Sequence, residues 1–273
     1  MISHRLLTHD SIYKLLPQIN PDHHLLFYSY LTQRKEKALF FCQFVENNLT
    51  AIFAYFSELP FPAFSFFRLE ESNLFFSELI AFVRESIKLD ENAICGTILC
   101  QQDLDLFQSF GLIKAIPQPF FNMKHQDESK LLEPNIVEKI SEKEYPAVID
   151  FLNKGGMRFF IRSELENCPF LGIKEGNKFS AVGGYHFFDP KLVELGNIVT
   201  RIDCRGRGLA KLITSELTHL GKKRSPDVYL GVMADNLPAV RVYEGLGYDV
   251  IAELYLVNFT LSGTPIPIEQ KGS

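Results

Sequence analysis

Short apolar runs alternate along the chain with stretches in which apolar residues recur every three or four positions. In the first half, the apolar runs 38–45 and 49–58 are joined by the polar Glu46-Asn47-Asn48, a pattern that predicts a β-hairpin. The other strands predicted in this half span 64–69, 93–99 and 113–123. Helical spacing of apolar residues predicts helices over 11–19, 24–34, 72–87 and 104–110.

The second half continues the alternation. After a short strand at 137–140, Ser141 and Glu144 form the spacing of a capping box, which predicts a helix to residue 152. The remaining predicted strands span 170–174, 179–187, 193–200, 228–233 and 250–259, and the remaining predicted helices span 208–220 and 238–245. Strands and helices mixed in this order predict an α/β fold built on a mixed sheet.

The chain is long enough for two domains, and its polarity suggests where they divide. Residues 124–135 (KHQDESKLLEPN) form the most polar central stretch and include Pro134, as in a linker. We therefore expect one domain over 1–124, a linker over 125–135, a second domain over 136–261 and a tail over 262–273. Because 17 of the 25 Phe residues precede residue 125, the first half resembles a scaffold more than an active site.

Charge and cysteine content exclude some partners. The net charge is −5 and the pI about 5.8, whereas a protein that neutralises nucleic-acid phosphates is usually basic. We find neither a signal peptide nor an apolar span of about 18 residues, so we expect a cytoplasmic protein without a membrane partner. The five cysteines are odd in number and lack CxxC spacing, which favours reduced thiols and no metal site.

The strand predicted at 193–200 runs through a short loop of Arg and Gly directly into a helix. The first amides of a helix lack intrahelical partners, and the helix dipole favours an anion there. Gly206 and Gly208 would let phosphate oxygens approach the backbone, and Arg205 and Arg207 add positive charge. The loop is neither a Walker A nor a dinucleotide-binding motif. The alternative is a basic turn that binds nothing.

A second motif follows the strand at 228–233 and reads DNLPAVRVYEGLGY over 235–248. Asn236 is also a suitable helix N-cap, with Pro238 in the first turn. Tyr243 could be a core aromatic residue whose hydroxyl merely finds a partner. Gly247 could simply end the helix.

Together these motifs resemble the GNAT acetyltransferases. Arg205-Gly206-Arg207-Gly208-Leu209-Ala210 is similar to the family's Gln/Arg-x-x-Gly-x-Gly/Ala loop, and 236–248 is similar to its Asn-x-x-Ala-x-x-x-Tyr-x-x-x-Gly-Phe/Tyr signature. The two motifs occur in the family's order, and the resemblance covers roughly residues 135 to 260. One departure is Ile202, where many members have Pro.

The resemblance implies acetyl-CoA as co-substrate, an amine as acceptor and no metal. It places the pyrophosphate on amides of the Arg/Gly loop and the pantetheine arm along the preceding strand. The implied acetyl-CoA-binding residues are Ile198, Val199, Thr200, Arg205, Gly206, Arg207, Gly208, Leu209, Ala210, Asn236 and Ala239. It also implies that Tyr243 hydrogen-bonds or protonates the departing sulfur. It suggests Glu194 as the general base, with His186 as second choice. A surface Glu and a structural His are equally open readings.

The first half contains a segment with the same strand–helix–Gly–strand layout as the second motif. Setting Gly111 beside Gly247, an offset of 136 residues, pairs Phe107 with Tyr243 and Cys100 with Asn236. Neither Phe nor Cys can replace the polar group opposite it. We therefore expect tandem GNAT folds with a degenerate N-terminal one, similar to glycine N-acyltransferase-like two-domain proteins.

The expected activity is transfer of an acetyl group to the amine of a small or amino-acid-like acceptor by direct attack on the thioester. Two alternatives stay open: a non-catalytic acyl-CoA-binding protein with a regulatory role, and an enzyme with a longer acyl donor. The acceptor, the acyl length, the general base and the oligomeric state, including a homodimer, are also open.

Overall fold

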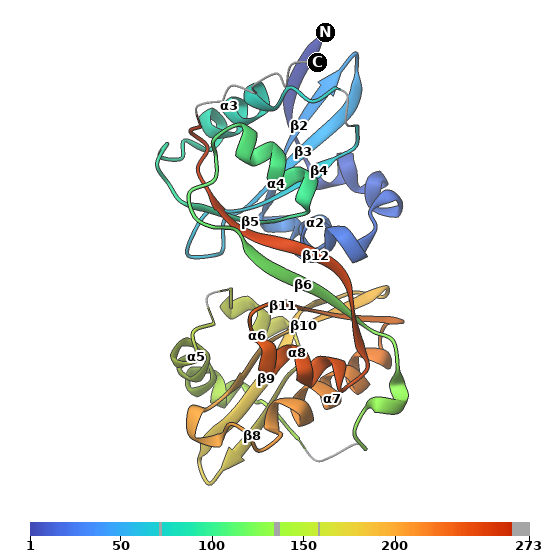
Figure 1. The fold of residues 1–273 in the computed structure, drawn as a ribbon, viewed down its shortest axis with the longest axis vertical. Coiled ribbons are helices and arrows are strands. Elements are labelled where there is room, and N and C mark those ends of the chain that lie inside the picture. Colours follow the sequence, from blue (N-terminus) through green and yellow to red (C-terminus); the bar gives the residue numbers. More distant parts are fainter. Residues whose placement is uncertain (71–72, 134–136, 158, 264–273) are drawn as a thin grey trace, which may run out of the picture. The chain divides into compact units, whose positions relative to one another are not determined.

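The computed structural model describes residues 1–70, 73–133, 137–157 and 159–263. The chain forms two compact units, one of residues 1–120 together with those from Glu253 onward, and one of residues 121–252. In each unit a sheet is covered by helices (Figure 1). The predicted mixed α/β fold is therefore confirmed.

The first unit is built on five N-terminal strands and one strand from the end of the chain. Its strands are β1 (Ile2–Leu7), β2 (Ala38–Val45), β3 (Asn48–Phe56), β4 (Ala63–Arg68), β5 (Cys95–Leu99) and, last in the sheet order, β12 (Tyr248–Phe259). Its helices are α1 (His9–Ile12), η1 (Tyr13–Gln18), α2 (Pro21–Leu31), η2 (Lys35–Lys37), α3 (Phe76–Ile87) and α4 (Gln101–Ser109). Strands β1 to β4 pair antiparallel in sequence order, whereas β4 and β5 are parallel.

The phenylalanines of the first half form its core. Phe53, Phe66, Phe76 and Phe107 are buried against one another with ring centroids 5.2 to 6.0 Å apart. Phe259 from β12 packs into the same cluster. The predicted hairpin is confirmed, because Glu46 and Asn47 both adopt positive φ, the geometry of a tight two-residue turn.

The second unit repeats this arrangement of strands. Its strands are β6 (Gln118–His125), β7 (Glu138–Lys139), β8 (Phe170–Glu175), β9 (Lys178–Phe188), β10 (Leu192–Thr200) and β11 (Asp227–Met233). They lie in the order β6-β11-β10-β9-β8-β7. As in the first unit, four successive strands pair antiparallel and the fourth is parallel to the fifth. The repeated topology indicates that the two halves share one fold.

Helices cover both faces of the second sheet (Figure 1). They are η3 (Glu128–Lys130), η4 (Glu142–Glu144), α5 (Tyr145–Lys154), α6 (Arg162–Asn167), η5 (Ile202–Cys204), α7 (Leu209–Lys222) and α8 (Leu237–Glu244). Ile213 and Leu217 of α7 pack with Tyr185 and Leu195 on one face, together with residues of α8. Val148, Leu152 and Leu165 of α5 and α6 pack on the other face. The capping box of Ser141 and Glu144 is present.

The boundaries between the units differ from the expected ones. Lys124 and His125 end strand β6 instead of beginning a linker, and β12 leaves the second unit at Glu253, so its residues Tyr255–Phe259 pair with Leu99–Cys95. The polarity at the start of this segment is misleading, because His125 is a buried strand residue. His125 Nε2 lies 3.1 Å from the carbonyl oxygen of Leu246. Pro134 lies outside the described residues.

Strand β1 and helix α6 escaped prediction, and another element is of a different type. Neither β1 nor α6 has a clear apolar period, because half of the residues in each are exposed. The helix predicted over 11–19 is one turn of α1 followed by the 3₁₀ segment η1, which contains Pro17.

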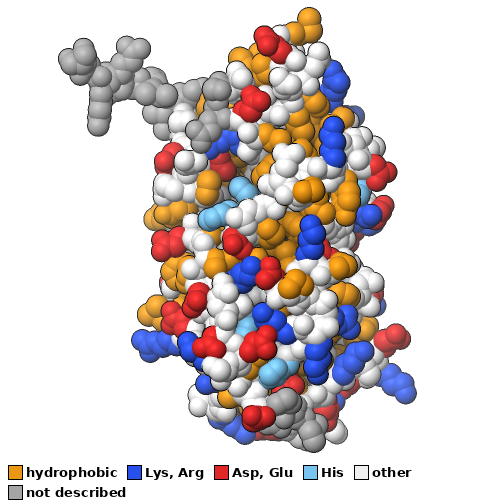
Figure 2. Space-filling view, turned by 90° about the vertical axis from the view of Figure 1, so that its right-hand side faces the viewer, with side chains coloured by type: hydrophobic (Ala, Val, Ile, Leu, Met, Phe, Trp, Pro, Cys, Tyr) orange, Lys and Arg blue, Asp and Glu red, His pale blue; other side chains and the backbone are white. Residues whose placement is uncertain are grey.

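The surface agrees with a modest net charge. On the face in Figure 2, basic and acidic side chains are interspersed, so the described residues present no continuous basic strip there. All five cysteines are free. In the described parts of the chain, no helix is both long and apolar enough to cross a membrane.

Candidate functional site

The parallel strands β10 and β11 separate halfway along their length. Their register runs from Leu192↔Asp227 to Leu195↔Leu230, although β10 continues to Thr200 and β11 to Met233. Beyond this point the described pairing of β10 is with β9 alone. An extended ligand could therefore add to the backbone of β10 as a further strand does.

The predicted pantetheine residues lie on this separated part of β10. The side chain of Ile198 packs on the α7 face of the sheet and that of Val199 on the α5 face, so only their backbone follows the strand edge. The hydroxyl oxygen of Thr200 is buried and has no hydrogen-bond partner in the part of the chain that the structure describes. A buried polar atom of this kind suits a ligand that supplies the partner.

The Arg/Gly loop leads from η5 into the N-terminus of α7. Gly206 and Gly208 have φ of +76° and +77°, and a Cβ built on either would meet nothing within 4 Å. Gly208 is the N-cap of α7, and no side chain caps the helix. The amides of Leu209 and Ala210 in the first turn are therefore available to an anion. This loop offers the open backbone that a pyrophosphate requires.

The arginines around the loop are partly engaged within the protein. Arg207 forms an ion pair with Glu175, and this hydrogen bond lowers the pKa of the Glu175 carboxyl. Arg205 donates from Nε to the Thr200 carbonyl at 3.4 Å. Because Arg207 is 54% exposed, its ion pair is worth little and can give way to a phosphate.

Asn236 is the N-cap of α8, as one reading of the sequence predicted. Its Oδ1 accepts a hydrogen bond from the amide of Ala239 at 3.4 Å. The side chain is exposed, and its Nδ2 donates no hydrogen bond to another described residue. The cap uses the oxygen of the amide, so a ligand could still bind its nitrogen.

Tyr243 lies in the core between α8 and the sheet. It is 8% exposed and packs in the same cluster as Leu195 and Leu230, the residues at which β10 and β11 separate. Burial raises the pKa of its phenol to about 12, so the hydroxyl stays protonated at neutral pH. The hydroxyl makes no hydrogen bond to another described residue, which leaves it able to donate to a ligand.

Two β-bulges lie side by side where the parallel strands separate. Opposite Glu194 and Leu195 of β10 stand Phe187 and Tyr185 of β9, so His186 is an extra residue in β9. Between Gly196 and Val199 the extra residue is in β10, and Asn197 adopts a φ of +54°. Bulges re-aim side chains, and these two aim His186 and Asn197 at one carboxylate.

That carboxylate belongs to Glu164 of α6, which is 3% exposed. His186 Nδ1 lies 3.2 Å from both of its oxygens, and Asn197 Nδ2 donates to Oε2 at 2.8 Å. The imidazole lies over Gly196, where a Cβ would collide with Nε2 and Cδ2. Sequence reasoning named His186 only as a second choice and missed Glu164, because helical spacing cannot tell it from its exposed neighbours Arg162 and Glu166.

Glu194, the base suggested by sequence, lies at the near end of this region. It is half-buried on β10, opposite Phe187 of β9 and Tyr229 of β11. One residue, Leu195, separates it from Gly196, so it lies close along the strand to the bulges.

The corresponding helix starts in the first unit carry different side chains. Cys100 is the N-cap of α4, as Asn236 is of α8, and Phe107 is fully buried seven residues later. Buried Asp103 forms an ion pair with Arg68 at 3.2 Å and accepts from the Cys100 thiol. Ahead of α3, the amide of Phe75 donates to Gln43 Oε1. Here an internal side chain occupies the amide at the helix start.

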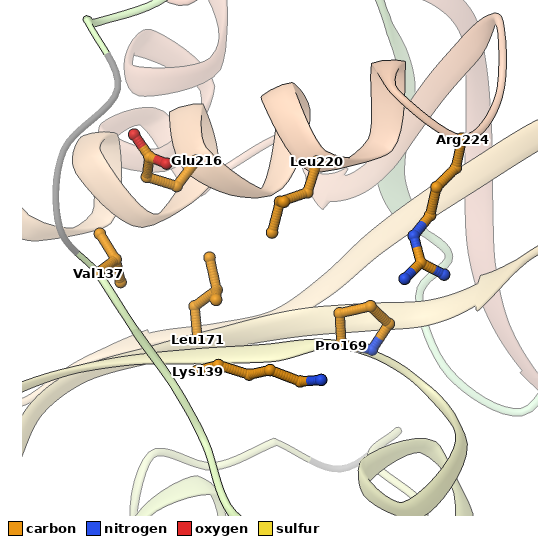
Figure 3. A pocket seen from close by; sticks show the side chains of 7 residues that line it. All are labelled: Val137, Lys139, Pro169, Leu171, Glu216, Leu220 and Arg224. Carbon is orange, nitrogen blue, oxygen red and sulfur yellow. The ribbon is translucent and has the colours of Figure 1, made fainter.

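A separate pocket of about 320 Å³ lies between α7 and strands β7 and β8 (Figure 3). Its lining residues are Val137, Lys139, Pro169, Leu171, Glu216, Leu220 and Arg224. None of the predicted site residues lines it, so it is distinct from the Arg/Gly loop. The described residues contain no group of His, Cys, Asp and Glu arranged to hold a metal ion.

Comparison with known proteins shows which family and which folds the chain is similar to. Residues 133–248 match the model of the acetyltransferase (GNAT) family. Two curated relatives are named mycothiol acetyltransferase. The one from Nocardioides sp. is 47% identical over 60 residues, 20% of each chain, and the one from Corynebacterium aurimucosum is 36% identical over 93 residues, 31% of each. The chain thus spans less than a third of either relative.

Solved structures match nearly the whole chain. A tandem GNAT protein from the clavulanic acid biosynthesis pathway has a TM-score of 0.67 at 10% identity, covering 97% of this chain and 100% of that one. An acetyltransferase of the GNAT family from Colwellia psychrerythraea has a TM-score of 0.61 at 15% identity, covering 95% and 100%. At these identities the likeness concerns the fold. The chain therefore has the GNAT fold, and the segment that matches the family model lies within the second unit.

Proposed function

We propose that the second unit is an acetyl-CoA-dependent N-acetyltransferase acting on a small amine. The observation that carries this proposal is the uncapped glycine loop at the start of α7, placed directly after a strand that leaves its parallel neighbour. One end of this arrangement suits a pyrophosphate and the other an extended amide chain, and acetyl-CoA contains both. The GNAT family match over the same residues supports this reading.

The residues fit the co-substrate in a defined order. The backbone from Gly206 to Ala210 would hold the pyrophosphate, with Arg205 and Arg207 balancing its charge. The backbone of Ile198, Val199 and Thr200 would pair with the pantetheine amides, and Asn236, with Ala239 in the first turn of α8, would bind the same arm. The orphaned Thr200 hydroxyl supports a polar ligand at this position.

The chemistry requires a neutral amine beside the thioester carbonyl. The amine nitrogen forms the new C–N bond, the C–S bond breaks, and the thiolate takes up a proton. Tyr243 would donate that proton, because its buried phenol is protonated at neutral pH. Backbone amides at the bulge of β10 would support the oxyanion, and a base near this strand, for which the sequence suggested Glu194, would accept a proton from the amine, directly or through water.

The acceptor belongs to the class of small amines, among which the comparisons suggest candidates. Two partial relatives are named mycothiol acetyltransferase, and the two-domain layout resembles glycine N-acyltransferase-like proteins. A screening panel would therefore include the acceptor of the mycothiol acetyltransferases, glycine and other amino acids, and a polyamine.

The test is a calorimetric titration of acetyl-CoA into the wild type and into Gly208→Glu. We expect micromolar binding to the wild type and its loss in the variant, whose carboxylate would repel the pyrophosphate. Gly156→Glu is the matched control, because Gly156 also has positive φ (+77°) and open space around its Cβ position. Absence of binding to the wild type would reject the proposed function.

A non-catalytic acyl-CoA-binding protein is the second candidate. It would keep the glycine loop without needing a buried, protonated phenol at the point of strand separation. Release of CoA in the presence of the amine panel distinguishes the two candidates. If the wild type binds acetyl-CoA but releases no CoA with any amine, the binding role is favoured over catalysis.

A further inference from the structure

We propose that His186 is the catalytic base of the acetyl transfer, that Glu164 is its positioning residue, and that the amine approaches from the sheet face covered by α5 and α6. This inference rests on the proposed function and assigns a role to two residues that the sequence motifs do not contain. It also replaces Glu194 as the group that takes the proton.

The first support is the set of hydrogen-bond partners around the Glu164 carboxylate. A carboxylate this buried is unfavourable unless it is paired and hydrogen-bonded. Here Oε2 accepts from Asn197 Nδ2 at 2.8 Å, and both oxygens lie 3.2 Å from His186 Nδ1. An ionised carboxylate only accepts, so Nδ1 carries the hydrogen. That tautomer places the basic lone pair of the imidazole on Nε2.

The second support is where Nε2 lies. The ring edge that contains it rests over Gly196, the first residue of β10 beyond the last pair with β11. Only a glycine leaves room for the ring at this position. The nitrogen of the base thus stands at the point where a thioester between β10 and β11 would present its carbonyl.

The third support is the irregular backbone that holds His186 and Asn197 against Glu164. Two neighbouring strands carry consecutive bulges, and Asn197 adopts a left-handed conformation that non-glycine residues seldom take. A simple tie between α6 and the sheet needs neither bulge. Strained residues held by their surroundings are typical of sites where chemistry occurs.

The amine nitrogen loses two protons in the reaction, and His186 and Tyr243, on opposite faces of the sheet, each handle one of them. The ammonium form of the acceptor gives one proton to His186 Nε2, which passes it to solvent, and the neutral amine then attacks the carbonyl carbon. As the C–N bond forms and the C–S bond breaks, Tyr243 protonates the thiolate from the α8 face. The second proton lost by the amine nitrogen restores the phenol. One proton is released per acetyl group transferred.

Charged groups on the elements packed against His186 define its surroundings. On α6 these are Glu164 and the exposed ion pair of Arg162 with Glu166, and on α5 the exposed pair of Asp150 with Lys154. Glu194 lies on β10, and the Cys168 thiol donates to the His186 carbonyl. Of these groups Glu164 contacts the imidazole, at 3.2 Å from Nδ1, and it is buried.

The first arm of the test needs no acceptor. Nitrogen NMR of histidine-labelled protein reports which ring nitrogen of His186 carries the hydrogen, assigned by comparison with His186→Gln. We expect the Nδ1–H tautomer in the wild type and a mixture of tautomers in Glu164→Gln. An Nε2–H tautomer in the wild type would overturn the assignment, whether or not an acceptor amine is known.

The second arm uses an amine that the wild type acetylates. We expect His186→Gln to lower kcat by a factor of about 10² to 10⁴ without changing the affinity for acetyl-CoA, and to abolish the acid limb of the kcat/KM profile. Glu164→Gln should lower kcat less and shift that limb. Glu166→Gln, two residues along the same helix and exposed, is the matched control and should match the wild type.

The outcomes separate this inference from the proposed function. Wild-type turnover with an unchanged rate and acid limb in His186→Gln would reject the base and leave the acetyltransferase standing. Loss of both acetyl-CoA affinity and thermal stability in His186→Gln would mean that His186 and Glu164 form a structural pair, and would overturn the role of His186 as base. Absence of acetyl-CoA binding in the wild type would instead reject the proposed function itself.

Discussion

Asn197 donates a 2.8 Å hydrogen bond from its side-chain amide to the carboxylate of Glu164, 33 residues earlier in the chain. The bond joins a β-bulge in the strand before the glycine loop to a short helix that precedes β8. It therefore connects the face of the second unit that carries α6 to the strand on which we place the pantetheine arm.

The conformation of Asn197 and its hydrogen bond can be tested separately. Asn197→Ala should lower the free energy of unfolding by about 2 to 3 kcal/mol, because it leaves the Glu164 carboxylate short of a donor and puts a Cβ-bearing residue without compensation at positive φ. Asn197→Gly removes the bond but tolerates the φ, and should cost about 1 kcal/mol less. Urea denaturation followed by circular dichroism measures both, and equal losses would contradict the strain at this position.

A methyl group at position 196 should displace the imidazole of His186. Gly196→Ala places a Cβ against Nε2 and Cδ2, so we expect a loss of about 1 to 3 kcal/mol in unfolding free energy and a fall in kcat like that of His186→Gln. The double variant Gly196→Ala with His186→Ala removes the collision. It should recover most of the stability but none of the rate, and strict additivity of the two losses would contradict the contact.

Tyr243→Phe should lower kcat by about a hundredfold while the affinity for acetyl-CoA stays within a factor of about two, because only the leaving thiolate needs the proton. Stopped-flow detection of the released thiol gives kcat, and calorimetry gives the affinity. A variant with wild-type kcat would remove Tyr243 from the mechanism and leave it a core residue.

The same tyrosine makes stability depend on alkaline pH. Burial raises its pKa to about 12 in the folded chain, against about 10 when unfolded, so above pH 10 the unfolded chain loses this proton first. The contribution is complete below pH 10 and is lost as the pH rises toward 12. Between pH 9 and pH 11 the wild type should lose about 1 kcal/mol more than Tyr243→Phe, measured by denaturation at both pH values.

We expect one acetyl-CoA per chain. In the first unit, Gln43 already accepts from the amide of Phe75 ahead of α3, and the ion pair of Arg68 with buried Asp103 stands beside Cys100 at the start of α4. Calorimetry should give a stoichiometry near one, and Gly208→Glu should abolish all binding. A second site that survives in that variant would show that the first unit also binds the co-substrate.

Local chemistry explains what could be predicted from sequence. Three features each depend on a few adjacent residues: the hairpin at Glu46-Asn47, the capping box at Ser141 and the glycine loop at Gly206. They can therefore be recognised in the sequence without knowledge of the fold. The pairing of Cys100 with Asn236 also followed from spacing alone, and both prove to be helix N-caps.

Long-range relationships could not be predicted in this way. Nothing in the segment around Glu164 distinguishes a buried carboxylate from the exposed ones beside it, because its burial depends on bulges in β9 and β10. Likewise, the apolar pattern of β12 predicts a strand but not its partner. The polarity of the segment from Lys124 suggested a linker, whereas His125 is a buried strand residue whose Nε2 lies 3.1 Å from the Leu246 carbonyl oxygen, a contact that sequence does not display.

The path of β12 has a consequence for synthesis of the protein. Val257 and Phe259 complete the hydrophobic core of the first unit, and they leave the ribosome after the whole second unit has been made. The first unit therefore cannot finish folding while it emerges, and the edge of β5 that pairs with β12 must wait unpaired. A chain that stops near residue 247 would keep every residue of the glycine loop and still expose this open edge beside a phenylalanine-rich core, an arrangement prone to aggregation.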